Sequence, residues 1–312
     1  MTNISKTILF FGTEDFSAHT LTALINRGFS IGAIITKPDT RRGRRSSHTQ
    51  PRVKTIGQAH GIPVWQPTRL RDIADDIQRF DNPIGVLVSY GKIIPQSIID
   101  LFNPGIINLH PSLLPQYRGP SPIESAILAG DTQTGISIMQ LSAQMDAGPV
   151  YLQEHITLSG RETSPELYDK LGTRGAELLS ETLPRIIEGT FVVEFGARLA
   201  SPQDEDTATY CQLIKKSDGL IDWTKPAQDI EREIRAYLGW PGSRASIGQL
   251  DVIVTAAHVV SSPGLTPGEY TVFGDAIIFG TTHNALCIDR LKPIGKKEMP
   301  VQAFLSGYKA IV

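Results

Sequence analysis

The sequence has few cysteines and no long apolar run, and each of these absences excludes a class of protein. Its two cysteines, Cys211 and Cys287, lie far apart and form no Cys-x-x-Cys pair, so neither a disulfide framework nor a zinc site is expected. No stretch reaches the ~18 apolar residues that a membrane span requires, and the amino-terminal apolar run carries a charge without a cleavage pattern. We therefore expect a cytoplasmic protein without a metal ion or a membrane contact.

Signatures of nucleotide sites and of serine hydrolases are also missing. The segment FGTEDF after the first apolar run lacks the spaced glycines of a dinucleotide site, and the glycine before Lys296 lacks the partners of a phosphate-binding loop. No Gly-x-Ser-x-Gly elbow occurs, so Ser112 is weak support for a serine nucleophile. The sequence gives no basis for a bound nucleotide or for acyl-serine chemistry.

Charge is present but unevenly distributed. The 312 residues are 40% apolar with a net charge of −2, which is typical of one large globular domain or two ordinary ones. Between residues 37 and 54, however, seven lysines and arginines stand against the single acid Asp39. Proline, glycine and the absence of apolar periodicity predict an exposed loop there. One interpretation is a solvated loop; we favour polyanion binding, because closely spaced cations repel one another unless phosphates neutralise them.

Apolar segments alternate with helical patterns through the first two thirds of the chain. Strands are expected at 7–11, 29–36, 84–89, 105–109 and 134–141. Such strands, without a polar face and separated by helices, predict a doubly wound α/β fold with a mostly parallel sheet covered on both sides. A helix over 163–189 begins with Thr163 and Glu166 at capping-box spacing. Five short apolar runs then follow between 245 and 291, as in a small β-barrel.

The change from alternating strands and helices to a series of short strands predicts the domain organisation. Residues 1–198 are expected to form the α/β domain and residues 217–312 the small β domain. Residues 199–216 are acidic, then basic, and lack apolar periodicity, so they are expected to be an irregular linker.

Polar residues stand where an expected strand ends. The stretch GIINLHPSLLPQYRG places Asn108 and His110 at the end of an apolar run, and Asp146 lies in a tight turn between two further strands. Sheets of this class bind ligands at the carboxyl ends of their strands. A turn aspartate usually bonds to its own backbone, and His110 could simply tether the proline-rich loop. The residues alone therefore leave catalytic and structural interpretations open.

Several motifs together carry a resemblance to a known family. They are NLHPSLLPQYRG at 108–119, the glycines at 130 and 135, and MDAG at 145–148, accompanied by FFGTEDFS, TKPDTRRGR, AYLGWPG and PIGKKEM. The chain resembles the 10-formyltetrahydrofolate-dependent formyltransferases over nearly its whole length, and most closely those that act on methionyl initiator tRNA. The resemblance implies a Rossmann-like catalytic domain, an OB-like carboxyl-terminal domain that holds tRNA, and 10-formyltetrahydrofolate as formyl donor.

The resemblance also implies roles for individual residues. The catalytic positions are Asn108, His110 and Asp146. The folate-binding positions are Ser112, Leu113, Leu114, Pro115, Tyr90 and Gly91. The tRNA-binding positions are Lys37, Arg41, Arg42, Arg44 and Arg45, with Arg44 in the place of the family's most important arginine. Arg45, Ser46, Ser47 and His48 follow it, where the commoner family pattern has lysines and a leucine.

The chemistry of formyl transfer explains why an asparagine, a histidine and an aspartate would be needed. An amine that attacks the formyl carbon creates a tetrahedral intermediate with an oxyanion and a positively charged nitrogen. The Asn108 amide is a neutral donor for the oxyanion. His110 lies two residues along an extended chain, on the same side, and could donate a second hydrogen bond or move the proton. Asp146 would orient the imidazole or accept the amine proton through water.

Other functions remain open at this point. A sugar-nucleotide amine N-formyltransferase would share the catalytic trio, but its small substrate gives no reason for the basic run. A non-catalytic module that binds tRNA or folate would leave Asn108 and His110 structural. The resemblance favours an enzyme that transfers the formyl group to methionyl initiator tRNA in translation initiation, and we expect it to act as a monomer.

Overall fold

The computed structural model describes residues 6–42, 47–190 and 200–308. The chain divides into two units, each described by itself. The first unit comprises Met1–Pro122, Thr134–Thr157 and Tyr168–Cys211, and the second comprises Ile123–Gln133, Leu158–Leu167 and Gln212–Val312. In the described parts, no helix combines the length and the apolar character that crossing a membrane would take.

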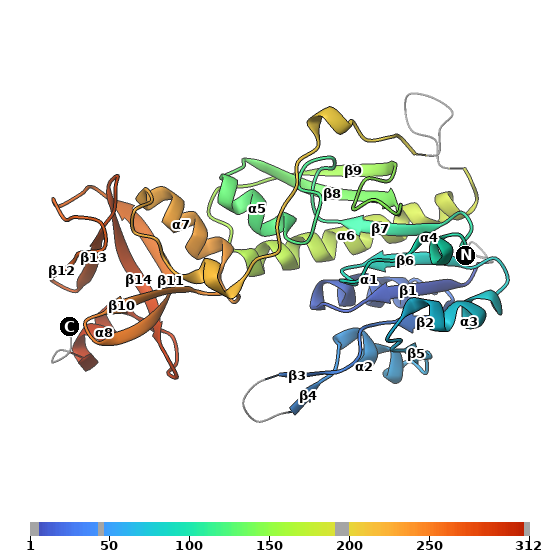
Figure 1. Cartoon of the computed structure of the whole chain (residues 1–312), viewed down its shortest axis with the longest axis horizontal. Helices are drawn as coiled ribbons and strands as arrows, with labels where there is room; N and C mark the ends of the chain where they lie inside the picture. Colours follow the sequence, from blue (N-terminus) through green and yellow to red (C-terminus); the bar gives the residue numbers. More distant parts are fainter. Residues whose placement is uncertain (1–5, 43–46, 191–199, 309–312) are drawn as a thin grey trace. The chain divides into compact units, whose positions relative to one another are not determined.

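The first unit is built on a seven-stranded sheet with the order β5-β2-β1-β6-β7-β8-β9 (Figure 1). Its strands are β1 (Ile8–Gly12), β2 (Ile31–Ile35), β5 (Val64–Trp65), β6 (Ile84–Val88), β7 (Ile106–His110), β8 (Gln133–Gln140) and β9 (Val150–Thr157). The strands β5, β2, β1, β6 and β7 pair in parallel, and β8 pairs with β7 in the antiparallel sense. The predicted mostly parallel α/β sheet is confirmed.

Helices cover both faces of this sheet. One face packs against η1 (Leu70–Ile73), α3 (Ala74–Gln78) and α4 (Gln96–Ile99), whose apolar side chains join Ile106 of β7 in one buried cluster. On the other face Leu109 of β7 lies against Gly175 of α6 (Ser164–Ile187), and α6 contacts α1 (Asp15–Asn26) through Tyr168 and Phe16. Successive β7 residues alternate between the two faces, so even positions of β7 share the α4 face.

The basic segment expected to be an exposed loop contains two short strands. β3 (Thr40–Arg42) pairs with β4 (Ser47–Thr49) in antiparallel register, with Arg41 opposite His48. α2 (Arg52–Ala59) follows directly. A two-stranded hairpin satisfies its backbone groups locally and needs no buried face, so the sequence shows no apolar alternation there. We call residues 40–49 the basic hairpin; residues 43–46 lie outside the described parts.

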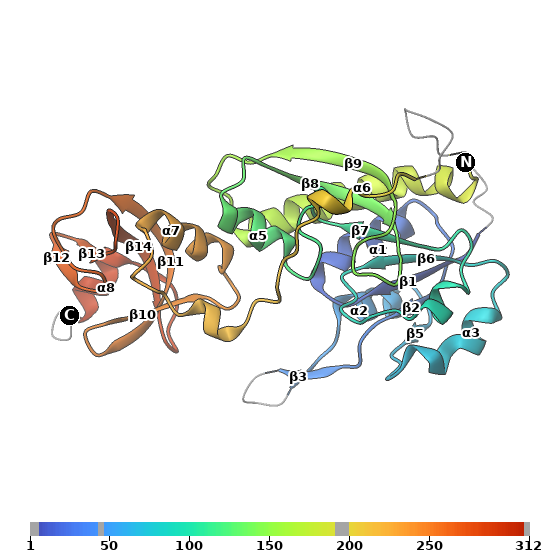
Figure 2. The same ribbon diagram turned by 45° about the horizontal axis from the view of Figure 1, so that its top comes forward.

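The second unit carries an antiparallel sheet of a different character (Figure 2). Its order is β10-β11-β14-β13-β12, with β15 paired to β14. The elements are α5 (Pro122–Ala129), η3 (Lys216–Gly219), α7 (Ala227–Ala236), β10 (Ser243–Ile247), β11 (Leu250–Val260), β12 (Tyr270–Phe273), β13 (Ala276–Gly280), β14 (Ala285–Pro293), β15 (Met299–Pro300) and α8 (Val301–Tyr308). In the described residues β10 and β12 do not pair, so the five predicted strands form a half-barrel. Its core includes Trp223 stacked on Phe279 at 4.1 Å.

The segment expected to be a linker is largely part of the first unit. Residues up to Cys211 belong to that unit, and the segment includes the short turn η2 (Glu205–Thr207). Its backbone pairs with β9 at Ser201 and with Arg118 at Tyr210. The predicted limits of 198 and 217 therefore stay predictions, while the described part of the segment has specific partners.

Candidate active site

Asn108 and His110 lie side by side on one face of β7, at its carboxyl end. Both side chains are buried, with 4% and 5% of the residue surface exposed, and both share the face of Ile106 because strand residues alternate. The neighbouring residues Ile107 and Leu109 are apolar and fill the opposite face. Within the described residues the Asn108 amide makes no hydrogen bond. Its amide atoms are not among the fully buried atoms that lack a partner, so they remain accessible to a ligand.

The His110 imidazole has a different neighbour at each nitrogen. Its Nε2 lies 3.0 Å from the carbonyl oxygen of Tyr117. A carbonyl can only accept, so Nε2 carries a proton. Nδ1 lies 3.8 Å from Oδ2 of Asp146, which is too long for a direct hydrogen bond but close enough for strong attraction once the ring is charged. The structure thus brings His110 and Asp146 together across 36 positions of sequence.

Asp146 reaches His110 by a route that the sequence did not indicate. Because β8 runs antiparallel to β7, its last residue Gln140 lies opposite Ile107, near the start of β7. The loop that follows must therefore fold back along the sheet to place Asp146 beside His110. Gly148 allows this, since a Cβ there would collide with the carbonyl oxygen of Gln140.

The Asp146 carboxylate is fixed from the loop that follows β7. Its Oδ2 accepts a hydrogen bond of 2.8 Å from the Gly119 backbone N–H. Asp146 itself has a φ of 49°, a left-handed conformation that costs a residue with a side chain about 1 kcal/mol or more. Gly119 has a φ of 122°, which suits glycine. A strained aspartate held by a neighbouring amide is oriented before any substrate arrives.

The expected folate segment Ser112–Pro115 is held largely by internal bonds. Ser112 is fully buried and its hydroxyl donates to the Gln116 carbonyl at 2.6 Å. Ser137 Oγ accepts from the Leu114 N–H at 3.0 Å and donates to the Ser112 carbonyl at 2.7 Å. The polar groups of this segment are therefore largely engaged within the chain, and Leu113 and Pro115, which are half-buried, offer mainly apolar surface.

Tyr90 and Gly91, also expected to bind folate, lie just beyond the end of β6, after Ser89. Tyr90 is 1% exposed, and its phenol has no hydrogen-bond partner among the described residues. Burial raises the pKa of Tyr90 to about 12 because the charged form is desolvated. The Lys37 side chain, expected to bind tRNA, lies against Gly91. The structure therefore places Lys37 at this strand end, beside the folate positions.

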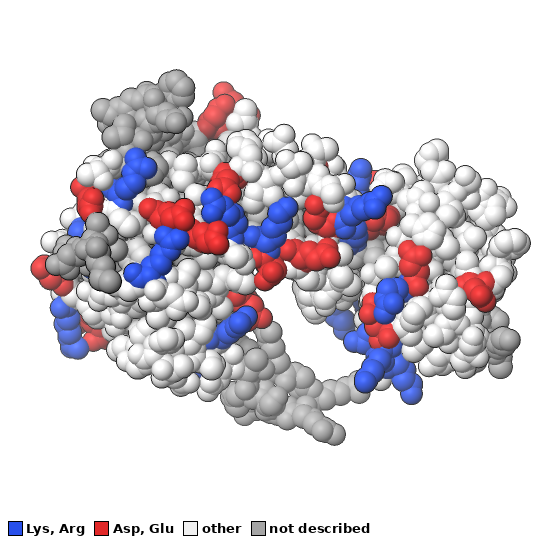
Figure 3. Space-filling model, turned by 180° about the vertical axis from the view of Figure 1, so that it is seen from behind, with Lys and Arg blue, Asp and Glu red and all other residues white. Residues whose placement is uncertain are grey.

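The other cations expected to bind tRNA lie in the basic hairpin. The backbones of Arg41 and Arg42 form part of β3, whereas Arg44 and Arg45 lie outside the described residues. On the face shown in Figure 3, lysines and arginines are interspersed with acids over the described surface. Lys54 close to the hairpin is neutralised, since its Nζ lies 2.8 Å from the Asp39 carboxylate.

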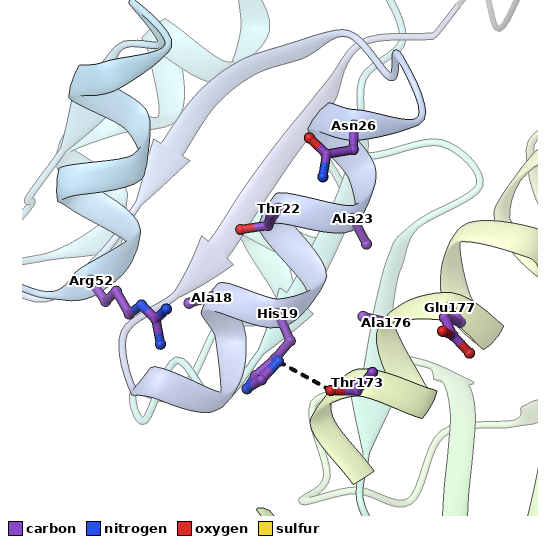
Figure 4. Close-up of a pocket in the computed structure, with 9 residues that line it drawn as sticks. All are labelled: Ala18, His19, Thr22, Ala23, Asn26, Arg52, Thr173, Ala176 and Glu177. Carbon is purple, nitrogen blue, oxygen red and sulfur yellow. Dashed lines mark hydrogen bonds between the residues drawn. The ribbon is translucent and has the colours of Figure 1, made fainter. Parts of the chain in front are cut away.

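A hollow of about 320 Å³ lies between α1, α6 and the start of α2. His19 and Thr173 face each other across it at 3.5 Å, and Arg52 and Glu177 contribute opposite charges (Figure 4). None of the expected catalytic or folate residues lines this hollow. Among the described residues, no group of three or more His, Cys, Asp or Glu is arranged to hold a metal ion.

Sequence reasoning missed the residues that support the trio. Arg118 is 1% exposed and pairs with Glu205 through two hydrogen bonds of 2.8 Å. Gln203 donates to the carbonyl oxygens of Asp146 and Gly148, both at 2.7 Å. Arg118 belongs to the NLHPSLLPQYRG motif and could have drawn attention as the one Lys, Arg, Asp or Glu in the sequence between His110 and Glu124. Nothing in the spacing of Gln203 pointed to Asp146.

Comparison with known proteins gives concordant results along the chain. The "Formyl transferase" family model matches residues 6–183, and the "Formyl transferase, C-terminal domain" model matches residues 213–309. A protein of Geobacter metallireducens described as methionyl-tRNA formyltransferase is 37% identical over 96% of this chain and 95% of its own length. One of Chloroflexus aggregans with the same description is 38% identical over 97% of both chains.

A solved structure shows the same fold at low sequence identity. It is the N-formyltransferase from Helicobacter canadensis in complex with folinic acid and dTDP-3-aminofucose, with a TM-score of 0.67 and 17% identity over 91% of this chain and 98% of that one. At this identity the likeness is one of fold.

Proposed function

The chain belongs to the formyl transferase family, and from this premise we propose that it transfers the formyl group of 10-formyltetrahydrofolate to the α-amino group of methionyl initiator tRNA. The observation that carries the proposal is the constellation at the end of β7: an Asn108 side chain on the same face as a His110 that faces the Asp146 carboxylate at 3.8 Å. The full-length similarity to methionyl-tRNA formyltransferases supports the choice of acceptor.

The residues around the trio fit a folate that carries a formyl group. The buried Tyr90 phenol has no partner among the described residues and could bond to a polar atom of a ligand. The Asn108 amide, which makes no hydrogen bond within the described part of the chain, could do the same. Leu113 and Pro115 would contribute apolar contact. When bound, 10-formyltetrahydrofolate supplies the electrophilic formyl carbon.

Asn108 is proposed to stabilise negative charge on the formyl oxygen. Its amide N–H groups are neutral donors in a buried site, where an oriented hydrogen bond is stronger than in water. Removing one such donor from an oxyanion site typically costs about 3 kcal/mol of transition-state stabilisation. Because the Asn108 amide has no hydrogen bond within the described residues that it would first have to break, it needs little rearrangement before the reaction.

His110 is proposed to receive the proton that the attacking amine loses and to return it to N10 of the folate, whose bond to the formyl carbon breaks as the tetrahedral intermediate collapses. With Nε2 donating to Tyr117, the neutral ring carries its lone pair on Nδ1, which faces Asp146. Protonation of Nδ1 creates an imidazolium, and the Asp146 carboxylate, 17% exposed, stabilises this charge. Asp146 thus acts on the ring and is itself kept in place by the Gly119 N–H.

The basic hairpin and the second unit are proposed to bind the tRNA. The small formyl acceptor of a sugar enzyme does not need seven cations within residues 37 to 54, whereas a phosphate backbone attracts them. The carboxyl-terminal formyl transferase domain, matched at residues 213–309, would provide further contact. We place the enzyme in the cytoplasm, where translation begins, and propose that it acts as a monomer.

Formyl transfer by the purified chain tests the proposal directly. The chain is incubated with 10-formyltetrahydrofolate and, in parallel, methionyl initiator tRNA, uncharged initiator tRNA or a dTDP-linked amino sugar, and formylated product is measured by mass spectrometry. We expect rapid product formation only with methionyl initiator tRNA. Transfer to the amino sugar alone would replace the proposed acceptor, and no transfer to any acceptor would overturn the enzymatic assignment.

A further inference from the structure

Residues 201–211, here called the strap, run along the active-site loop of the first unit. At one end Ser201 exchanges two backbone hydrogen bonds with Val150 of β9, at 2.8 and 2.9 Å. At the other end the Cys211 N–H donates to the Arg118 carbonyl at 2.8 Å. A segment with no apolar periodicity is thus paired by its backbone to the region that holds the trio.

Gln203 uses its whole side-chain amide to join the strap to the Asp146 turn. Its Nε2 donates to the carbonyl oxygens of Asp146 and Gly148, both at 2.7 Å. Its Oε1 accepts from Nε of Arg118 at 3.0 Å. A primary amide has two N–H donors, and both fix the main chain on either side of Ala147. Gln203 therefore restrains the turn in which Asp146 holds a left-handed φ of 49°.

Arg118 anchors Gln203 and the strap together. Its guanidinium forms a two-bond pair with Glu205 and a further bond of 3.1 Å to the Tyr210 hydroxyl. The hydrogen bonds from Arg118 lower the pKa of Glu205. Such a two-bond arginine–carboxylate pair fixes geometry as well as charge. The amide of Gln203 is consequently held in one orientation.

The strap also fixes the other neighbour of the imidazole. Thr209 Oγ1 accepts from the Tyr117 backbone N–H at 2.8 Å, and the Tyr117 carbonyl binds Nε2 of His110. Tyr117, like Asp146, has a positive φ, here 57°. Both groups that flank the His110 ring are therefore strained residues whose backbones are bonded to strap side chains.

We propose that Gln203 and Thr209 are positioning residues for formyl transfer: they hold the Asp146 carboxylate and the Tyr117 carbonyl on either side of His110. The inference rests on the proposed function for its catalytic consequence. Neither side chain needs to touch a substrate. Their effect is on the chemical step, since a small displacement of a catalytic group can cost about a hundredfold in rate.

Replacement of Gln203 tests the proposal with two different outcomes for two variants. We expect Gln203→Ala to lower kcat about ten- to a hundredfold while KM for tRNA and for the folate stays nearly unchanged. Gln203→Glu keeps an acceptor for Arg118 but turns a carboxylate toward two carbonyl oxygens, so we expect a larger loss of kcat. If Gln203 merely attached the strap, glutamate, which pairs with Arg118, would be milder than alanine. Asp206→Asn, an exposed strap residue, is the matched control and should be normal.

A measurement without substrate separates this inference from the proposed function. The Gly119 amide proton donates directly to Asp146, so its NMR chemical shift reports the position of that carboxylate. We expect a clear shift in Gln203→Ala and Thr209→Ala and none in Asp206→Asn. An unchanged Gly119 signal, or unchanged kcat in Gln203→Ala, overturns the positioning role. A moved signal in a chain that formylates no tRNA would instead overturn the proposed acceptor and leave the positioning role supported.

Discussion

The end of β7 and the basic hairpin are built in opposite ways. At the end of β7, Asn108 and His110 are buried, and the Asp146 turn is held by hydrogen bonds from Gly119 and Gln203. The basic hairpin contains two three-residue strands that, within the described residues, pair with each other. Its four arginines stand in two adjacent pairs on either side of Gly43 in the sequence. One region depends on where each atom lies, and the other on how much charge it carries.

This difference predicts which kinetic parameter a mutation in each region should change. In the β7 site one removed atom changes the alignment of several groups, so effects should appear in kcat. In the hairpin each arginine is proposed to add one increment of attraction to phosphate, so effects should appear in KM and in salt dependence. The following variants test that division, beginning with the largest expected effect.

The variant His110→Ala should give the largest loss. It removes the ring between Tyr117 and Asp146 and with it the proposed proton acceptor, so we expect kcat to fall about 10²- to 10⁴-fold with little change in thermal unfolding. Single-turnover formylation under saturating tRNA and folate measures the chemical step. His19→Ala, in the hollow beside α1, is the matched control. Near-normal turnover of His110→Ala would exclude His110 from the reaction.

The hairpin variant Arg42→Ala/Arg44→Ala/Arg45→Ala should act on binding. We expect KM for methionyl-tRNA to rise by about tenfold or more at physiological salt, and the slope of log affinity against log salt to fall by about two to three, since three phosphate contacts are lost. The KM for 10-formyltetrahydrofolate should not change.

A triple replacement of equal charge elsewhere provides the control for the hairpin variant. Arg69→Ala/Arg71→Ala/Arg79→Ala removes three arginines near α3, where Arg71 and Arg79 are 69% and 78% exposed. If both triple variants weaken tRNA binding equally, the effect is one of total charge and the hairpin has no particular role.

The smallest effect is expected for Tyr90→Phe. Since the buried phenol lacks a partner in the described residues, its removal should leave the free energy of unfolding unchanged or raise it by about 1 kcal/mol. The folded-state pKa of Tyr90 is raised to about 12, whereas an unfolded tyrosine loses its proton near pH ~10. The free energy of unfolding of the parent protein is therefore unaffected by this group below pH ~10 and falls as the pH rises through 12. The variant should therefore unfold less readily between these values.

Tyr151→Phe is the comparison for Tyr90→Phe. Burial also raises the pKa of Tyr151, but its hydroxyl donates to Gln140 at 3.3 Å, so its removal should cost stability. A raised folate KM in Tyr90→Phe alone would show that the phenol bonds to the folate. A marked loss of stability in Tyr90→Phe would contradict the absence of an internal partner.

The sequence predicted the strands that carry the candidate site residues better than it predicted how Asp146 comes to lie beside His110. Apolar runs and strand alternation were enough to place Asn108 and His110 on one face at a strand end. Asp146 was expected at another strand end, but β8 runs antiparallel, and its end lies at the wrong edge of the sheet. Only the folding back of the loop corrects this, and such a path depends on close contacts such as that of Gly148 with Gln140.

Prediction from the sequence failed mainly at contacts between segments that lie far apart in the chain. The run around Gln203 has no apolar period, and irregular structure was a fair expectation from composition. Its order comes from Arg118, 85 positions earlier, and no local pattern encodes that pairing. The basic hairpin escaped prediction for the converse reason, because its pairing is local and its sequence has no apolar alternation.

The strap has a consequence for the smallest piece of the chain that could be catalytically competent. A fragment ending with α6 at Ile187 would retain Asn108, His110 and Asp146. It would lack both amide hydrogen bonds that hold the aspartate turn and the partner of the buried Arg118 charge. The first unit therefore does not end with α6: its contacts extend through Cys211.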